Sequence, residues 1–158
     1  MKILMVNKFL YPKGGAETYV FRLGESLQAL GHEVQYFGME DENNIVGNHA
    51  KSYVSKIDFQ TGMLRNLSAP FRIIYSAQAR RKIRNVLEDF HPDIVHLNNI
   101  QFQLTPSMIL EIHRFDPSIK IVYTVHDYQL LCPNHGMIDN QMKPFTFIHQ
   151  KTTPIKED

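Results

Sequence analysis

A short apolar run, a glycine pair and an amphipathic segment follow one another in residues 1–31. Residues 2–7 (KILMVN) are apolar on both faces of an extended chain, which is typical of a strand buried in a parallel sheet. After Gly14 and Gly15 the apolar residues recur at helical spacing until Gly31, a residue type that often ends helices. This order of strand, glycine turn and helix limits the possible folds more than any other feature. The positions expected to face the sheet are Ala16, Tyr19, Val20, Leu23, Leu27 and Leu30.

The glycine turn between the first strand and the first helix has the chemistry of an anion site. A helix that starts there presents unpaired backbone N–H groups and the positive end of its dipole to whatever occupies the turn. Glycines let a phosphate or a sugar approach the backbone without meeting a Cβ atom. An isolated glycine pair more often makes only a tight turn. The position directly after the first strand favours phosphate binding instead.

The rest of the chain continues the alternation of strands and helices. We expect strands over residues 33–38, 51–57, 93–99 and 119–125, and helices over residues 61–68, 70–90 and 105–115. Thr105 and Pro106 resemble an N-cap followed by proline at the first helical position. Such alternation predicts an α/β fold with a doubly wound parallel sheet, and 158 residues suffice for one such domain. The apolar stripe of the long helix comprises Phe71, Tyr75, Ala79, Ile83, Val86, Leu87 and Phe90.

Polar residues follow the three most strand-like segments. Ligands of open parallel sheets bind beyond the carboxyl ends of the strands, at the point where the strand order reverses. We therefore expect one edge of the sheet to collect a candidate site. Its members are Asn7, Gly14, Gly15, His96, Asn98, Asn99, His126 and Asp127.

Other kinds of site find less support in the sequence. The glycine turn departs from the G-x-G-x-x-G pattern of dinucleotide-binding proteins, which disfavours a nicotinamide oxidoreductase. Cys132 and His135 have the spacing of half a zinc site, but no second pair completes it, so we expect no metal. His126 is compatible with a core histidine as well as with a catalytic one. No Ser-His-Asp arrangement is recognisable.

Charge and composition limit the partners and the compartment. A net charge of +1 gives no reason to expect nucleic acid, and a single cysteine suits a reducing compartment. The chain has neither a signal peptide nor an apolar run long enough to span a membrane, so we expect a cytoplasmic protein, at most peripheral to the membrane. Arg80, Arg81, Lys82 and Arg84 lie on one helix and could contact lipid head groups, although a solvated face is the simpler explanation.

In combination, these motifs resemble the amino-terminal domain of family 4 glycosyltransferases. The resemblance covers residues 1 to 133 and rests on five segments: residues 2–6, 14–17, 30–34, 92–96 and 124–127. It implies a Rossmann-like domain, one half of a GT-B architecture, in a retaining enzyme. Such an enzyme transfers a sugar from a nucleotide sugar to a saccharide, lipid-linked or small-molecule acceptor.

The resemblance also implies roles for individual residues. Backbone amides of Gly14, Gly15 and Ala16 would bind the donor diphosphate, with Glu17 beside them. His126 would be the catalytic residue that supports the developing positive charge, and Asp127 would orient its loop. The rule on carboxyl strand ends, independently of the resemblance, adds Asn7, His96 and Asn98 as substrate-binding residues. The family needs no bound metal or cofactor, since the nucleotide sugar is a co-substrate.

The chain also departs from the family pattern. We expect the carboxyl-terminal, donor-binding domain to be absent, residues 1–150 to form the acceptor-side domain and residues 151–158 to form a frayed polar tail. We expect such a fragment to be inactive alone. Two alternatives stay open: a self-sufficient nucleotide- or phosphate-binding protein, and a non-catalytic interaction module with this fold. The apolar and basic region of residues 71–84 hints at a lipid-linked acceptor.

Overall fold

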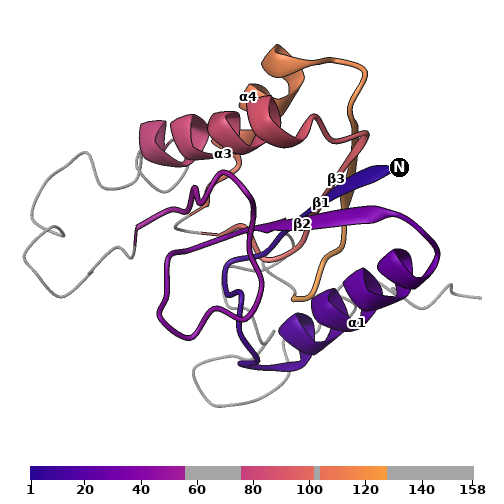
Figure 1. The fold of residues 1–158 in the computed structure, drawn as a ribbon. Helices are drawn as coiled ribbons and strands as arrows, with labels where there is room; N and C mark the ends of the chain where they lie inside the picture. The colour runs from indigo at the N-terminus through magenta and orange to yellow at the C-terminus, as the bar shows by residue number, and fades with distance from the viewer. Residues whose placement is uncertain (56–75, 102–103, 128–158) are drawn as a thin grey trace, which may run out of the picture. The chain divides into compact units, whose positions relative to one another are not determined.

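A computed structural model of the chain describes residues 1–55, 76–101 and 104–127 (Figure 1). The chain divides into two compact units, residues 1–124 and 125–158. All described helices and strands lie in the first unit. The helix expected over residues 61–68 and the tail at 151–158 fall outside the described residues.

The described part of the first unit contains a parallel sheet of four strands. In spatial order these are β2 (Glu33–Phe37), β1 (Lys2–Val6), β3 (Ile94–Leu97) and β4 (Lys120–Tyr123). Each neighbouring pair is parallel. The chain moves from β1 outward to β2 and then returns to place β3 on the other side of β1. The strand order therefore reverses between β1 and β3, as in other doubly wound sheets, and the expected α/β fold is confirmed.

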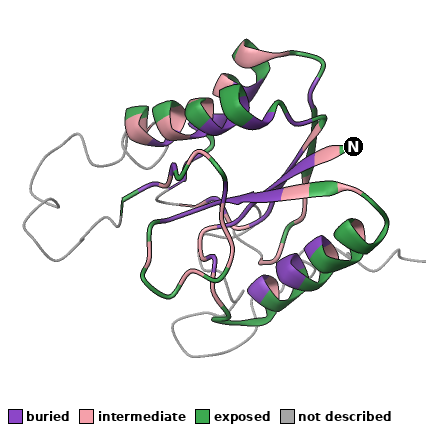
Figure 2. Cartoon of the chain, in the orientation of Figure 1, coloured by how far each residue is buried: buried purple, intermediate pink, exposed green. Residues whose placement is uncertain are grey.

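Helices cover both faces of this sheet (Figure 1). Helix α1 (Gly15–Ala29) packs through Val20 and Phe21 on the face formed by Ile3, Met5 and Tyr36. Helices α3 (Ala77–Phe90) and α4 (Ser107–Phe115) pack on the opposite face. Figure 2 shows burial concentrated in the strands and on the inward sides of the helices. Residues of β1 contribute alternately to the two faces, because successive side chains of a strand point in opposite directions.

Helix α1 ends as the sequence predicts, and part of the expected face packs on the sheet, because Val20 is buried and Leu23 and Leu27 are partly buried against the same cluster. Gly31 adopts a φ of +82°, and the N–H groups of Gly31 and His32 bond to the carbonyls of Gln28 and Leu27 in a Schellman motif. The expectation that Tyr19 and Leu30 face the sheet is wrong, because they are 41% and 74% exposed. The buried positions are Glu17, Val20, Phe21 and Gly24.

Three expected boundaries also need correction. Helix α3 begins at Ala77 rather than at residue 70, because Ser76 is extended and its hydroxyl caps the N–H of Ala79 at 3.1 Å. Thr105 has a φ of +60°, and Pro106 occupies the N-cap of α4 in its place. In the described part of residues 51–57, an isolated bridge from Val54 to Met39 stands where a strand was expected. The described members of the expected α3 stripe are all buried, namely Ala79, Ile83, Val86, Leu87 and Phe90.

Candidate functional site

The carboxyl ends of the four strands lie in register along one edge of the sheet. Val6 of β1 is paired with Phe37 of β2 and with Leu97 of β3, which is paired in turn with Tyr123 of β4. The residues that follow these strand ends are therefore neighbours across the edge. Asn7, His96 and Asn98 lie at the reversal point between β1 and β3, where the sequence predicts a site.

The glycine turn forms the start of α1 at this edge. Gly14 is the N-cap residue, with extended backbone (φ −165°, ψ −165°), and its carbonyl accepts the N–H and the hydroxyl of Thr18 at 3.1 and 3.0 Å. The first three N–H groups of the helix, from Gly15, Ala16 and Glu17, have no acceptor within an α-helix. These groups and the helix dipole make the turn suitable for an anion.

Gly15 is not required by the packing of the chain. A Cβ atom placed on Gly15 meets no atom within 4 Å. A Cβ atom on Gly24, in the middle of the same helix, would lie 1.8 Å from the hydroxyl oxygen of Tyr36. Glycine at position 24 therefore permits α1 to pack on β2. At position 15 a side chain would meet open space instead.

Asn7 connects three segments at this edge. Its side-chain nitrogen donates to the carbonyl of Phe9 at 2.7 Å and to Oε1 of Glu17 at 3.1 Å. Its side-chain oxygen accepts the N–H of Asn99 at 3.2 Å. Glu17, only 4% exposed, is thus tied to the loop after β1, which is tied to the loop after β3. These bonds give Asn7 and Glu17 a structural role, whereas contact with a substrate stays a prediction for both.

Asn98 and His96 are similarly engaged. The side-chain nitrogen of Asn98 lies 3.3 Å from the carbonyl oxygens of Val6 and of His96. Nε2 of His96 is hydrogen-bonded to the hydroxyl of Thr124 at 2.7 Å, and the ring of Tyr19 meets the His96 ring edge-on at 6.4 Å. Both residues are buried. They stabilise the carboxyl ends of β1, β3 and β4, and their direct binding roles stay predictions.

Lys8 and Lys13, which sequence reasoning missed, lie on the loop between β1 and α1. Both ammonium groups approach the ring of Phe9. The signal that could have found them is local, because Lys13 directly precedes the glycine pair and Lys8 directly follows Asn7. Lys13 directly precedes the N-cap residue Gly14, and its positive charge adds to the positive potential of the helix N-terminus.

The second unit contains the predicted catalytic residue. His126 and Asp127 follow β4 in sequence but belong to the unit of residues 125–158, so they are described apart from the glycine turn. Cys132 and His135 lie outside the described residues. Within the described ranges, no group of three metal-ligating side chains is present.

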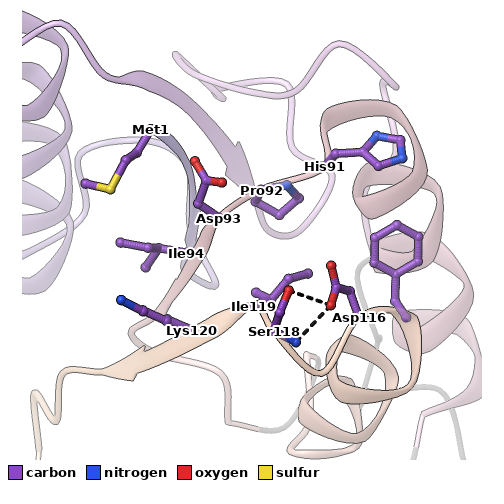
Figure 3. A pocket seen from close by; sticks show the side chains of 10 residues that line it. Met1, His91, Pro92, Asp93, Ile94, Asp116, Ser118, Ile119 and Lys120 are labelled. Carbon is purple, nitrogen blue, oxygen red and sulfur yellow. Dashed lines mark hydrogen bonds between the residues drawn. The ribbon is translucent and has the colours of Figure 1, made fainter.

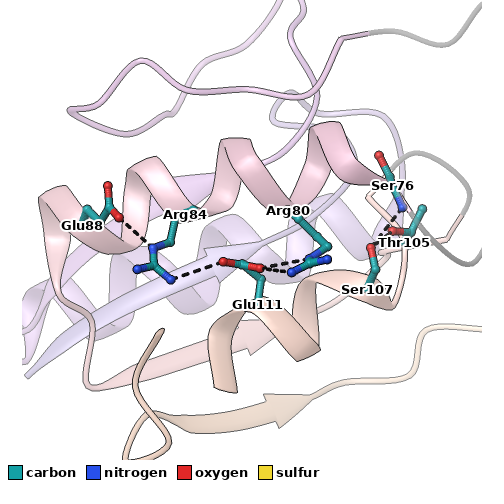
Figure 4. A network of polar contacts seen from close by, with 7 residues as sticks. All are labelled: Ser76, Arg80, Arg84, Glu88, Thr105, Ser107 and Glu111. Carbon is teal, nitrogen blue, oxygen red and sulfur yellow. Dashed lines mark hydrogen bonds and ion pairs between the residues drawn. The ribbon is translucent and has the colours of Figure 1, made fainter. Parts of the chain in front are cut away.

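Two of the four basic residues of α3, Arg80 and Arg84, contact neighbouring carboxylates (Figure 4). Nε of Arg80 donates to Glu111 at 3.0 Å, and Arg84 contacts Glu111 at 3.3 Å and Glu88 at 2.7 Å. Burial opposes ionisation of Glu111, but hydrogen bonds and charge from Arg80 and Arg84 outweigh it, and the pKa of Glu111 is lowered. These contacts join α3 to α4 and leave less of this face for an anionic acceptor or lipid. No helix in the described residues is long and apolar enough to cross a membrane.

A pocket of about 400 Å³ lies at the opposite edge of the sheet (Figure 3). Asp93, Ile94 and Lys120 line it at the amino ends of β3 and β4, with Phe115 and Asp116 from the end of α4. Asp116 accepts the N–H and the hydroxyl of Ser118, and these bonds lower the pKa of Asp116. The pocket is therefore separate from the glycine turn, at the edge where ligands of such sheets do not usually bind.

Comparison with known proteins relates the chain to sugar-transfer enzymes. The model of the family described as Glycosyltransferase Family 4 matches residues 13–152. The chain is also 28% identical, over 153 residues, to an uncharacterized 42.6 kDa protein in the cps region of Klebsiella pneumoniae. That alignment covers 89% of this chain and 40% of the relative, so the chain spans less than half the relative's length.

Proposed function

The chain belongs to glycosyltransferase family 4, and we propose that it forms the amino-terminal, acceptor-side half of a retaining enzyme. The enzyme transfers a sugar from a nucleotide-sugar donor to a saccharide, lipid-linked or small-molecule acceptor. A carboxyl-terminal domain holds most of the donor. The relative's description as a protein in a cps region supports polysaccharide biosynthesis as the context.

The observation that carries this proposal is the open glycine turn at the reversal point of the sheet. Gly14, Gly15 and Ala16 offer backbone N–H groups at the positive end of α1, and no atom within 4 Å fills the space at Gly15. A diphosphate fits this chemistry because its charge is concentrated on oxygen atoms that accept such hydrogen bonds. The helix dipole and basic side chains supply the electrostatic stabilisation, and neither a metal nor a cofactor is required.

The reacting groups are assigned to the loop after β4. His126 supports the positive charge that develops on the transferred sugar and contacts its hydroxyl groups, and Asp127 orients the loop. Glu17, at the start of α1, accepts a hydrogen bond from a substrate hydroxyl group. Asn7, His96 and Asn98 complete the substrate-binding edge of the sheet. The bonds that Asn7 makes to Glu17 and Asn99 favour an additional role in keeping this edge rigid.

An NMR titration tests whether the glycine turn binds the donor diphosphate. The 158-residue chain is titrated with UDP, GDP and their sugar conjugates, and the amide signals of Gly14, Gly15 and Ala16 are followed. We expect weak shifts that require the diphosphate, because most of the donor contacts belong to the other domain. Tight, saturable binding by this chain alone would support a self-sufficient nucleotide-binding protein instead. Absence of any shift at these amides would remove the glycine turn from the site.

A substitution in the full-length protein tests the catalytic assignment. His126→Ala should abolish sugar transfer while leaving the midpoint of the unfolding transition unchanged. His113→Ala is the matched control, because His113 is an exposed histidine on α4 and should leave the rate unchanged. Undiminished transfer by the His126→Ala enzyme would exclude a catalytic role and favour a non-catalytic module.

A further inference from the structure

The carboxylate of Glu17 is buried in the first turn of α1 with only one of its oxygens paired. Glu17 is 4% exposed, and its Oε1 accepts a hydrogen bond from the side-chain nitrogen of Asn7 at 3.1 Å. Within residues 1–55, 76–101 and 104–127, no group donates to the other oxygen, Oε2, and no basic side chain forms an ion pair with Glu17. A carboxylate oxygen removed from water without a donor is unfavourable. Oε2 therefore lacks a hydrogen bond that a ligand can supply.

The unpaired oxygen lies beside the glycine turn. A Cβ atom placed on Gly14 would be 3.4 Å from Oε2. In the described part of the chain, the fully enclosed side-chain atom without a partner is Oδ1 of Asn44, so Oε2 is not sealed from the surface. Gly14 is the N-cap residue, and the N–H groups of Gly15 and Ala16, which follow it, have no acceptor within the helix. One acceptor and several donors therefore adjoin one another at the turn.

Asn7 holds Glu17 but is itself enclosed by the protein. Its side chain is fully buried, and its nitrogen uses both hydrogens, one for Glu17 and one for the carbonyl of Phe9 at 2.7 Å. Its oxygen accepts the N–H of Asn99 at 3.2 Å, so a flipped amide would place two donors and two acceptors against each other. Asn7 therefore always directs a donor to Oε1 and leaves Oε2 at the turn.

The two kinds of group at the turn suit different parts of one ligand. An ionised carboxylate oxygen can only accept hydrogen bonds, and it repels phosphate oxygens, so the ligand group against Oε2 is a neutral donor such as a hydroxyl. The backbone N–H groups and the helix dipole favour an anionic group. A sugar phosphate carries a hydroxyl and an anion a few bonds apart. A phosphate without a hydroxyl would leave Oε2 unpaired and add a like charge beside it.

We propose that Asn7 is a positioning residue, which holds Glu17 so that the glycine turn selects a sugar phosphate over a phosphate without hydroxyl groups. Oε2 of Glu17 accepts a sugar hydroxyl while the N–H groups of the turn bind the phosphate. Asn7 contributes to the substrate-binding edge through Glu17 and not by touching the ligand. The assignment of the sugar phosphate to the nucleotide-sugar donor rests on the proposed function. The selectivity rests on the unpaired oxygen of Glu17 and the bonds of Asn7.

Glu17→Gln tests the selectivity, because it keeps an acceptor for Asn7 and replaces Oε2 by a donor. The 158-residue chain is titrated with inorganic phosphate and with the 1-phosphates of glucose, galactose and mannose, and the amide signals of Gly14 and Gly15 are followed by NMR. The wild type should bind at least one sugar phosphate about tenfold more tightly than inorganic phosphate, as for one hydrogen bond to a charged group. Glu17→Gln should lose this preference and bind inorganic phosphate at least as tightly as the wild type, because a negative charge is removed.

Glu25→Gln is the matched control for this substitution. Glu25 is an exposed glutamate on the same helix, paired at the surface with Arg22. It should keep the wild-type preference. Equal affinities of the wild type for all four phosphates, no binding of any of them, or an unchanged preference in Glu17→Gln would overturn the selectivity.

Asn7→Ala tests the positioning role. The preference for the sugar phosphate should fall as far as in Glu17→Gln, and the double variant Asn7→Ala/Glu17→Gln should show no additional loss. A purely structural role would lower the free energy of unfolding and leave the preference of the folded protein unchanged, which would overturn the positioning role. Should Asn7→Ala not fold, Asn7→Ser is measured in the same way. The proposed function fails separately, if the full-length protein transfers no sugar although Glu17→Gln removes the preference.

Discussion

Replacing Gly15 by valine separates binding from folding at the glycine turn. Gly15 is the first residue of α1, and a Cβ atom there meets nothing within 4 Å. Valine has a somewhat better helix propensity than glycine, so the free energy of unfolding should stay within about 0.5 kcal/mol of the wild-type value. The branched side chain would occupy the space in front of the helix N–H groups. Binding of a nucleoside diphosphate should therefore fall at least tenfold, about 1.4 kcal/mol.

Gly24→Ala is the matched control within the same helix. Its new Cβ atom would lie 1.8 Å from the hydroxyl oxygen of Tyr36 and 2.9 Å from the adjoining ring carbon. Tyr36 is 5% exposed, so its ring cannot move aside into solvent. Overpacking of this kind typically costs about 1 to 3 kcal/mol. The control should lose stability, in contrast to Gly15→Val.

Urea denaturation and NMR titration with UDP measure the two effects independently. The expected pattern is a stable Gly15→Val variant that binds poorly and a destabilised Gly24→Ala variant that binds normally while folded. Wild-type affinity in Gly15→Val would show that the glycine turn does not contact the ligand. Wild-type stability in Gly24→Ala would show that α1 does not pack on β2 at this distance.

Three further substitutions test the packing that supports the site. Asn7→Ala should lower the free energy of unfolding by about 2 to 4 kcal/mol in urea denaturation, because it leaves partners on Glu17 and Asn99 unbonded. Glu111→Gln should cost about 1 to 3 kcal/mol at pH 7, because it removes the counter-ion of Arg80. Since the pKa of Glu111 is lowered in the folded state, this difference should shrink as the pH falls below 4.5, its unperturbed value, and an unchanged difference would contradict the ion pairs. Ile112→Ala should cost about 2 to 5 kcal/mol, because Ile112 is fully buried in the core, and a smaller loss would place α4 elsewhere.

The fold could be predicted because its signals are local. Short apolar strands, helical spacing and punctuation by Gly31 and Pro92 define most elements within a few residues of chain. The start of α3 was not predicted, because the apolar stripe continues back to Phe71 although Ser76 is the N-cap residue. Thr105 does not cap α4 as predicted, and its hydroxyl instead bonds to that of Ser107, which in turn accepts the N–H of Ser76. That second bond spans two helices, and no local pattern encodes it.

The buried face of α1 shows a different limit. Hydropathy assigns a carboxylate to the solvent side and gives a glycine no preference, yet Glu17 and Gly24 are both buried. Glu17 is buried because Asn7 satisfies one of its oxygens, and Gly24 because Tyr36 occupies the space where a side chain would be. Each reason lies on another segment of the chain. The helix and the packing of Val20, Leu23 and Leu27 were therefore predictable, whereas the burial of Glu17 and Gly24 was not.

Some of the predicted site residues already use their side chains in bonds within the protein. The rule that ligands bind at carboxyl strand ends correctly brought Asn7, His96 and Asn98 to one edge. It could not show that Asn7 bonds to the backbone of Asn99 after β3, or that Asn98 bonds to the backbone of Val6 in β1, because the partners in each bond are 92 positions apart. A polar residue at a strand end can thus serve the ligand directly or hold the loops that do. Substitution of Asn7 should then change stability and affinity together, whereas substitution of Gly15 should change affinity alone.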